Sequence, residues 1–152
     1  MFQHCIYVLI IIASLTDSTE ILPAFRDSIL AGNAPSAVDM ISREAILEVD
    51  SVIASDPERV STLLSYFGLQ TEIHEIGSMT GRDLLLDILS SPTTTGIVML
   101  FGISPGEPLK SAGRLFVPLE YGFPGSRNTI YIEILPEDGE WKIDDFFETL
   151  PL

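Results

Sequence analysis

Five polar residues lie within short runs that the sequence predicts to be strands or strand ends, and their side chains are able to do chemistry. They are the candidates for a ligand-binding site: His74, Tyr121, Tyr131, Glu133 and Asp144. An imidazole titrates near neutral pH and suits acid–base catalysis, and a tyrosine hydroxyl can donate to a ligand. The competing interpretation makes His74 a surface or hydrogen-bonded strand residue and places the tyrosines at the rim of a sheet, where they need no ligand. No catalytic set can be assigned among the five.

One further motif matches a catalytic sequence pattern, but the residues around its serine do not suit catalysis. Gly102 to Gly106 reads Gly-Ile-Ser-Pro-Gly, which matches the Gly-x-Ser-x-Gly pattern of a nucleophile elbow. That elbow uses the N–H of the residue after the serine as an oxyanion donor, and Pro105 has none. The chain also lacks the spacings of zinc sites, calcium loops and phosphate-binding glycine loops. We therefore predict no metal and no cofactor.

Four apolar runs in the last third of the chain predict the sheet that would position these candidates. Each is about as long as an ordinary strand and is rich in β-branched and aromatic residues. Asp138-Gly139 supplies the positive φ of a tight reversal, so the last two runs are predicted to pair antiparallel. Pro118 cannot donate to a ladder and marks an edge or a bulge. The predicted strands are Thr95 to Ile103, Arg114 to Tyr121, Thr129 to Leu135 and Glu140 to Phe147.

Before this sheet, apolar residues recur at helical spacing. A first helix covers Ile21 to Leu30 and is closed by Gly32-Asn33, and Asp56-Pro57 is a clear helix start. The alternating run Thr71 to Ile76 predicts a strand that carries His74. The other expected helices cover Ala34 to Ile41, Arg43 to Ala54 and Leu84 to Leu89, the last stopped by Ser90-Ser91-Pro92. The fold class is thus α+β, in the order helices, strand, helix, four strands.

The N-terminus predicts an export signal. Cys5 to Ser14 is an apolar stretch too short to span a bilayer but suited to a signal-peptide core, although Met1 to His4 holds no Lys or Arg. We expect residues 1–18 to be a signal peptide and 19–152 a single domain, secreted or periplasmic. The alternatives are a buried element of the domain or an uncleaved anchor, which would be its only contact with a membrane.

The composition is strongly acidic. Eight Lys and Arg stand against 22 Asp and Glu, which gives a formal net charge of −14. Such a surface repels phosphate backbones and argues against nucleic-acid binding. It suits solubility or a basic protein partner.

Three phrases together resemble the nuclear transport factor 2-like superfamily, whose members are also described as SnoaL-like or cystatin-like α+β domains. They are Phe25 to Ala37, Gly77 to Leu89 and Gly139 to Phe146, which resemble its opening helix, its strand-to-helix turn and its terminal strand. The resemblance implies a strongly curved antiparallel sheet wrapped by helices into a cone with an apolar cavity. Such a cone would take a small apolar ligand, and its other sheet face would be available to an identical subunit in a homodimer.

Fold alone does not decide function, because such cones serve several roles. The first hypothesis is an exported, non-catalytic binding or interaction domain. The alternatives are a small cavity enzyme of the isomerase or hydrolyase kind, and an acidic immunity or inhibitor protein directed at a basic toxin.

Overall fold

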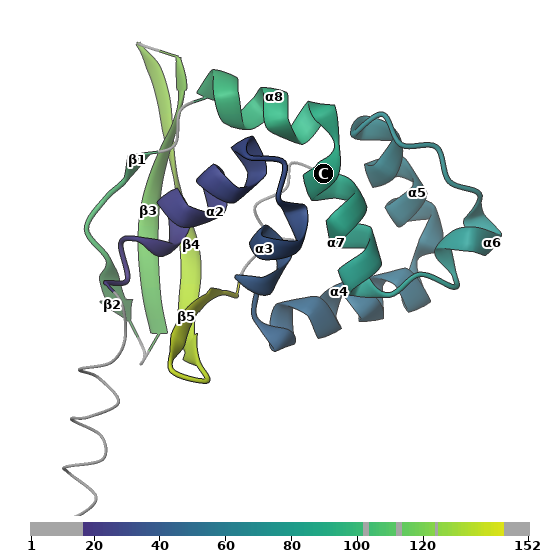
Figure 1. Cartoon of the computed structure of the whole chain (residues 1–152), viewed down its shortest axis with the longest axis horizontal. Helices are drawn as coiled ribbons and strands as arrows, with labels where there is room; N and C mark the ends of the chain where they lie inside the picture. Colours follow the sequence, from purple (N-terminus) through teal and green to yellow (C-terminus); the bar gives the residue numbers. More distant parts are fainter. Residues whose placement is uncertain (1–16, 102–103, 112–113, 124, 145–152) are drawn as a thin grey trace, which may run out of the picture.

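The computed structural model of the chain describes residues 17–101, 104–111, 114–123 and 125–144, and it is an α+β protein with an antiparallel sheet (Figure 1). The helices come first in the chain and the strands last. The helices are α2 (Ile21–Leu30), α3 (Ala34–Asp39), α4 (Arg43–Ser55), α5 (Pro57–Tyr66), α6 (Ile73–Ile76), α7 (Gly81–Ser90) and α8 (Pro92–Phe101). The strands are β1 (Ser104–Pro105), β2 (Leu109–Ser111), β3 (Arg114–Phe123), β4 (Ser126–Glu137) and β5 (Glu140–Ile143).

The sheet is an open antiparallel meander with the order β1-β3-β4-β5, and β2 continues the edge that β1 begins. The tight turn expected at Asp138-Gly139 is confirmed, with φ values of 53° and 83°. The connection between the predicted strands Arg114 to Tyr121 and Thr129 to Leu135 is much shorter than predicted, because β3 runs to Phe123 and pairs with β4 as far as Ser126. The residues 145–147 of the last predicted strand lie outside the described part of the chain.

Pro118 lies in the interior of β3, and the structure explains how the sheet tolerates it. Pro105 pairs with Leu119 but Leu109 pairs with Phe116, so the edge strand has one residue more than β3 between these pairs. This is a β-bulge, as the proline predicts. The Gly106 N–H donates to the Pro118 carbonyl at 2.7 Å, which places the missing N–H of Pro118 on the bulged edge rather than toward β4. A Cβ on Gly106 would lie 2.8 Å from Cγ of Pro118, so this close approach needs glycine.

Two predicted strands are wrong, because both segments are helical. Thr71 to Ile76 contains α6, where Glu72 and Glu75 form a reciprocal capping box. Thr95 to Ile103 is replaced by α8 as far as Phe101, and residues 102–103 are not described. Ser91 and Pro92, interpreted from sequence as a stop, also start this helix, since Ser91 Oγ accepts from the Thr94 N–H at 3.2 Å. The expected element order is therefore corrected to helices followed by strands.

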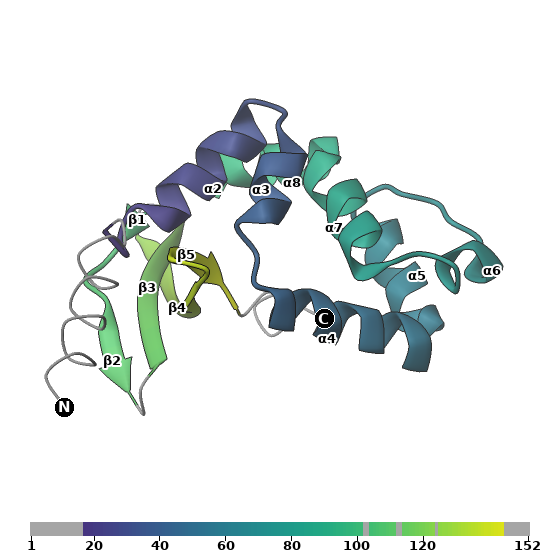
Figure 2. The ribbon, with the colours of Figure 1, turned by 60° about the horizontal axis from the view of Figure 1, so that its bottom comes forward.

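The buried residues form two clusters that α2 joins. Ile29 of α2 packs in a helical core with α3 to α8, whereas Leu22 packs against the sheet. Phe25 lies between them and contacts both clusters. Figure 2 shows α2 running from the sheet toward the helical bundle, with α5 and α6 at the far end. The sheet core comprises Leu22, Val117, Leu119, Ile132, Ile134 and Ile143.

The sheet is not closed, so the helices do not wrap it into a continuous cone. Its contacts with the helical half come mainly from α2, from the chain between α3 and α4, and from α8. Among the described residues, no helix combines the length and apolar character that crossing a bilayer requires. The predicted export signal lies almost wholly in residues 1–16, outside the described part of the chain.

Candidate functional site

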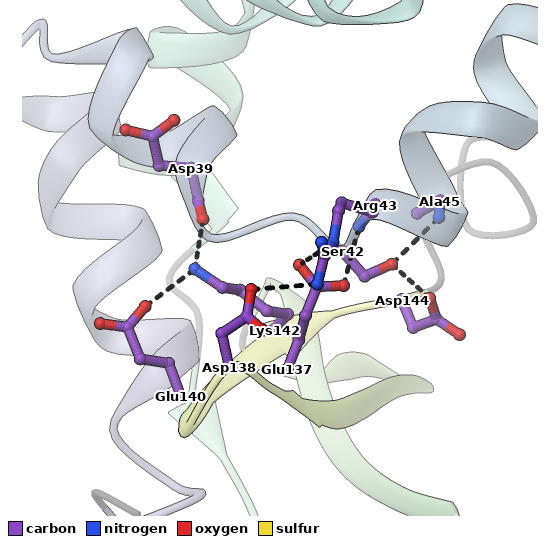
Figure 3. A network of polar contacts seen from close by, with 9 residues as sticks. All are labelled: Asp39, Ser42, Arg43, Ala45, Glu137, Asp138, Glu140, Lys142 and Asp144. Atoms are coloured by element: carbon purple, nitrogen blue, oxygen red, sulfur yellow. Dashed lines mark hydrogen bonds and ion pairs between the residues drawn. The ribbon is translucent and has the colours of Figure 1, made fainter.

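The junction between α4 and the β4–β5 hairpin is built around a buried serine. Ser42 is the N-cap of α4, and its hydroxyl accepts from the Ala45 N–H at 3.0 Å and donates to Asp144 (Figure 3). The Ser42 N–H donates to the carbonyl of Ile143 at 2.8 Å. An N-cap oxygen satisfies a backbone donor that the first helical turn leaves free. Ser42 therefore starts the helix and ties it to the end of β5.

Charged residues surround this junction on the solvent side. The Arg43 guanidinium contacts Glu137 at 3.3 Å and Asp138 at 3.0 Å, and the Arg43 N–H donates to Glu137 at 3.1 Å. Lys142 donates to the carbonyl of Asp39 at 2.7 Å and contacts Glu140 at 2.9 Å (Figure 3). The N-terminus of α4 carries partial positive charge. The carboxylate of Glu137 is therefore favourably placed where it accepts from the Arg43 N–H. Apart from the Lys142–Glu140 contact, these interactions join segments 94 to 103 residues apart in the chain.

A cavity of about 290 Å³ lies next to this junction, across the end of the sheet where β3 begins and β4 ends. Its apolar lining residues are Leu115, Ile134, Leu135, Pro136 and Trp141, and its charged ones are Glu44, Lys110, Arg114, Glu133 and Asp144. Small-ligand sites are typically concave and mostly apolar with a few placed polar groups. Five of the ten residues that line this cavity are charged, so it is more polar than such sites usually are, and its volume is at the small end of their range.

Most of the charges around the cavity are already engaged. Glu133 is held by Arg114 at 2.6 Å, and Asp144 accepts from Ser42 while its N–H donates to the carbonyl of Glu133 at 2.9 Å. Each of these carboxylates thus serves a contact within the protein. Lys110 and Glu44 differ, since neither has an ion-pair partner among the described residues. They are the two charges in the cavity that a ligand could meet unpaired.

The five residues predicted for a ligand site are not brought together. Glu133 and Asp144 both line the cavity, on neighbouring strand positions. Tyr131 lies two residues before Glu133 on β4 and is 52% exposed, but it does not line the cavity. Tyr121 is paired through its backbone with Asn128, and its side chain lies outside what the structure describes. His74 is exposed on α6, a helix and not a strand, at the end of the molecule away from the sheet.

Sequence reasoning missed several residues of this site. Ser42 stands directly before a helix predicted to start at Arg43, and this position is itself an N-cap signal that would have identified it. Trp141 alternates with the polar residues Glu140 and Lys142. This alternation predicts that Trp141 lies on the buried face of its strand, but it does not predict a cavity. Lys110 lies between the predicted strands Thr95 to Ile103 and Arg114 to Tyr121, and Glu44 carries no signal that relates it to the sheet. No group of three or more His, Cys, Asp and Glu residues in the described ranges is arranged to hold a metal ion.

Comparisons with known proteins give no family for the chain. No protein-family model, curated protein or solved structure matches it.

Proposed function

We propose that this protein is an exported, non-catalytic binding domain that holds a small ligand in the cavity at the sheet end. The observation that carries the proposal is the arrangement of the lining residues. The lining combines apolar side chains from β3, β4 and β5 with two charges that have no ion-pair partner among the described residues, Lys110 on β2 and Glu44 on α4. The complementary ligand has an apolar middle with an anionic end for Lys110 and a cationic end for Glu44.

A binding role fits this geometry better than catalysis. The neighbouring carboxylates Glu133 and Asp144 would be the natural acid–base pair, but Arg114 and Ser42 already occupy them. A general acid or base must be within reach of the proton it transfers and free to exchange it. The antiparallel meander and its terminal strand Glu140–Ile143 are compatible with the resemblance to the nuclear transport factor 2-like superfamily, but that resemblance does not decide between binding and catalysis because such domains serve several roles.

Trp141 allows a direct test, because it is the only tryptophan in the chain and it lines the cavity. Its fluorescence can be titrated with three probes of equal chain length: octanoate, octylamine and 8-aminooctanoate. We expect a saturable change with one site per chain, and the tightest binding for 8-aminooctanoate because it satisfies both charges. Equal affinity for all three probes, or no response of Trp141, would remove the proposed site.

Charge reversal identifies the residues involved. Lys110→Glu should shift the preference from octanoate to octylamine, and Glu44→Lys should shift it the other way. Arg59→Glu is a matched control, since Arg59 is also exposed without an ion-pair partner among the described residues but lies on α5, far from the cavity. The control makes the same change in net charge. A preference that moves equally in Lys110→Glu and Arg59→Glu would assign the effect to overall charge instead.

A further inference from the structure

The two edges of the sheet differ in how they are protected. One edge is the segment 104–111, which contains β1 and β2 and carries Pro105, Pro108, Lys110 and the β-bulge. Prolines, lysines and bulges at an edge discourage the addition of another strand. On the opposite side, β5 pairs only with residues 134–137 of β4, so among the described residues no strand lies beside residues 126–132. We name residues 126–132 the β4 edge, and it contains neither proline nor lysine.

Two hydrogen bonds show which main-chain groups point out of the β4 edge. The Pro118 carbonyl accepts from Gly106, on the far side of β3, and Pro118 lies opposite Tyr131 in the ladder. In an antiparallel ladder, both residues of a pair that is not hydrogen-bonded direct their N–H and C=O groups away from each other. Tyr131 therefore directs its groups away from β3. The Glu133 carbonyl, two residues further on, accepts from the Asp144 N–H at 2.9 Å, which agrees with this direction.

The same alternation applies along the whole β4 edge. The register between β3 and β4 is continuous, so Arg127, Thr129 and Tyr131 all direct their main-chain groups outward. Within the described ranges none of these three residues has a main-chain hydrogen bond on that side. A row of unpaired N–H and C=O groups is a template for one further strand.

We propose that residues 145–150 of this chain occupy the β4 edge as a continuation of β5. Asp144 follows β5 and is already in register, since its N–H donates to the carbonyl of Glu133. Two antiparallel strands advance residue by residue, so residue 150 would lie opposite Arg127. The sequence supplies eight residues after Asp144, which is enough chain to cover the β4 edge. The apolar pattern of the sequence predicts a strand as far as Phe147, and the register adds its partner and its extent.

The register also matches side chains across the two strands. Phe146 falls opposite Tyr131, which is 52% exposed, and aromatic pairs on neighbouring strands are favourable. Glu148 falls diagonal to Arg127 on the same face, and the two side chains carry opposite charges. The β4 edge holds no acidic residue, so it does not repel this acidic segment.

The covered face gives one further consequence of the register. Phe147 falls opposite the half-buried Ile130, whereas Asp145 falls opposite Ile132, which is only 7% exposed. Asp145→Val should therefore raise the urea midpoint, because it replaces a charge beside an apolar neighbour. Glu148→Val makes the same change on the opposite face and should not raise it. An unchanged midpoint in Asp145→Val would overturn the register.

Amide hydrogen exchange of the full chain, measured residue by residue by NMR, tests the pairing directly. The N–H groups of Asn128 and Ile130 point toward β3 and are protected with or without an occupant of the β4 edge, so they are internal controls. We expect the amides of Thr129 and Tyr131 to be protected as well, by at least about tenfold over an unpaired amide. Exchange of these two amides at the unpaired rate would overturn the proposal.

Two proline variants identify the segment that protects these amides. In the proposed pairing, the N–H of Glu148 points toward Thr129 and the N–H of Thr149 points away from β4. Glu148→Pro should therefore lower the protection of the Thr129 amide at least about tenfold, because proline removes that donor. Thr149→Pro is the matched control and should leave it protected, since proline is tolerated where the N–H of an edge strand faces outward. Equal protection of Thr129 in both variants would assign the cover to another segment and overturn the proposal.

A dilution series distinguishes the chain's own segment from a second copy. Protection of Thr129 and Tyr131 should be the same at about 20 and about 500 μM, because pairing within one chain does not depend on concentration. Protection that increases with concentration would place a second copy at the β4 edge and overturn the proposal. The ligand proposal stands or fails separately, because its tests change Lys110 and Glu44, which are not on the β4 edge.

Discussion

At the scale of single residues, Ser42 carries the connection between the helices and the sheet. It is fully buried, and its one hydroxyl both caps α4 and donates to Asp144. Ser42→Ala should lower the free energy of unfolding by about 1–2 kcal/mol, since it removes an N-cap and leaves a carboxylate without its donor. Urea unfolding measures this loss. Ser51→Ala, on an exposed position of the same helix, should change stability by less than about 0.5 kcal/mol. Equal midpoints for the two variants would contradict this role of Ser42.

Two carboxylates on α7 should respond to pH in opposite senses. Hydrogen bonds from the Thr80 side chain and backbone lower the pKa of Asp83, whereas burial and then the charge of Asp83 raise the pKa of Asp87. A lowered pKa gives stability that is present above the unfolded value of about 3.9 and is lost as pH falls through the folded value. A raised pKa means that ionised Asp87 opposes folding at any pH above its folded value.

Matched amide variants separate the two effects. Asp83→Asn should lower the urea midpoint at pH 7, and the difference from wild type should shrink below about pH 4. Asp87→Asn should raise the free energy of unfolding at pH 7, and with it the urea midpoint, by about 0.2–0.5 kcal/mol, the typical cost of like charges four residues apart on a helix. This gain should disappear as pH falls below the folded pKa of Asp87. If both variants shift the urea midpoint at pH 7 in the same direction, the opposite pKa shifts assigned to Asp83 and Asp87 are wrong.

At the scale of elements, two glycines in helices test how closely the helices pack. A Cβ on Gly81 would lie 2.6 Å from the Ile46 carbonyl oxygen, at the contact of α7 with α4, whereas a Cβ on Gly96 in α8 would meet nothing within 4 Å. Gly81→Ala should therefore destabilise the protein by about 1–3 kcal/mol. Gly96→Ala should stabilise it by about 0.5–1 kcal/mol, since alanine is the better helix former. Thermal unfolding followed at 222 nm compares them. A destabilising Gly96→Ala would contradict the helical assignment of α8.

The sequence predicted elements well where local signals and burial agree. The cap at Asp56-Pro57 and the turn at Asp138-Gly139 are confirmed, because each fixes the backbone by itself. The prediction from sequence failed where a run rich in β-branched residues, which favours a strand, follows a residue that caps a helix. Thr95 to Phe101 has strand-like residues, but it belongs to a helix that begins at Pro92, directly after Ser91, whose hydroxyl accepts from the Thr94 N–H, and that packs Val98 into the helical core. Tertiary packing overrides such propensities. The site was less predictable, since the sequence does not show that Glu44 and Lys110 line one cavity with Glu133.

At the scale of the whole molecule, the two cores should unfold with different sensitivity to mutation. Trp141 packs against the sheet core and reports mainly on the sheet half, and the far-UV signal at 222 nm reports mainly on the helices, which in the described part of the chain precede the sheet. Leu22→Ala removes a side chain from the sheet core, and Ile29→Ala, two turns later on α2, removes one from the helical core. Each should cost about 2–5 kcal/mol.

In urea, we expect the Trp141 fluorescence transition and the 222 nm transition to separate, and their order to be opposite in the two variants. In Leu22→Ala the Trp141 transition should precede the loss of the 222 nm signal, because the sheet loses its principal contact with α2. In Ile29→Ala the helical signal should be lost first. The cores are linked by α2, by the contact of α8 with β3, and by the hydrogen bonds and ion pairs around Ser42, which are few compared with the contacts inside each core. Coincident transitions in both variants would mean that these links suffice to make the protein a single cooperative unit.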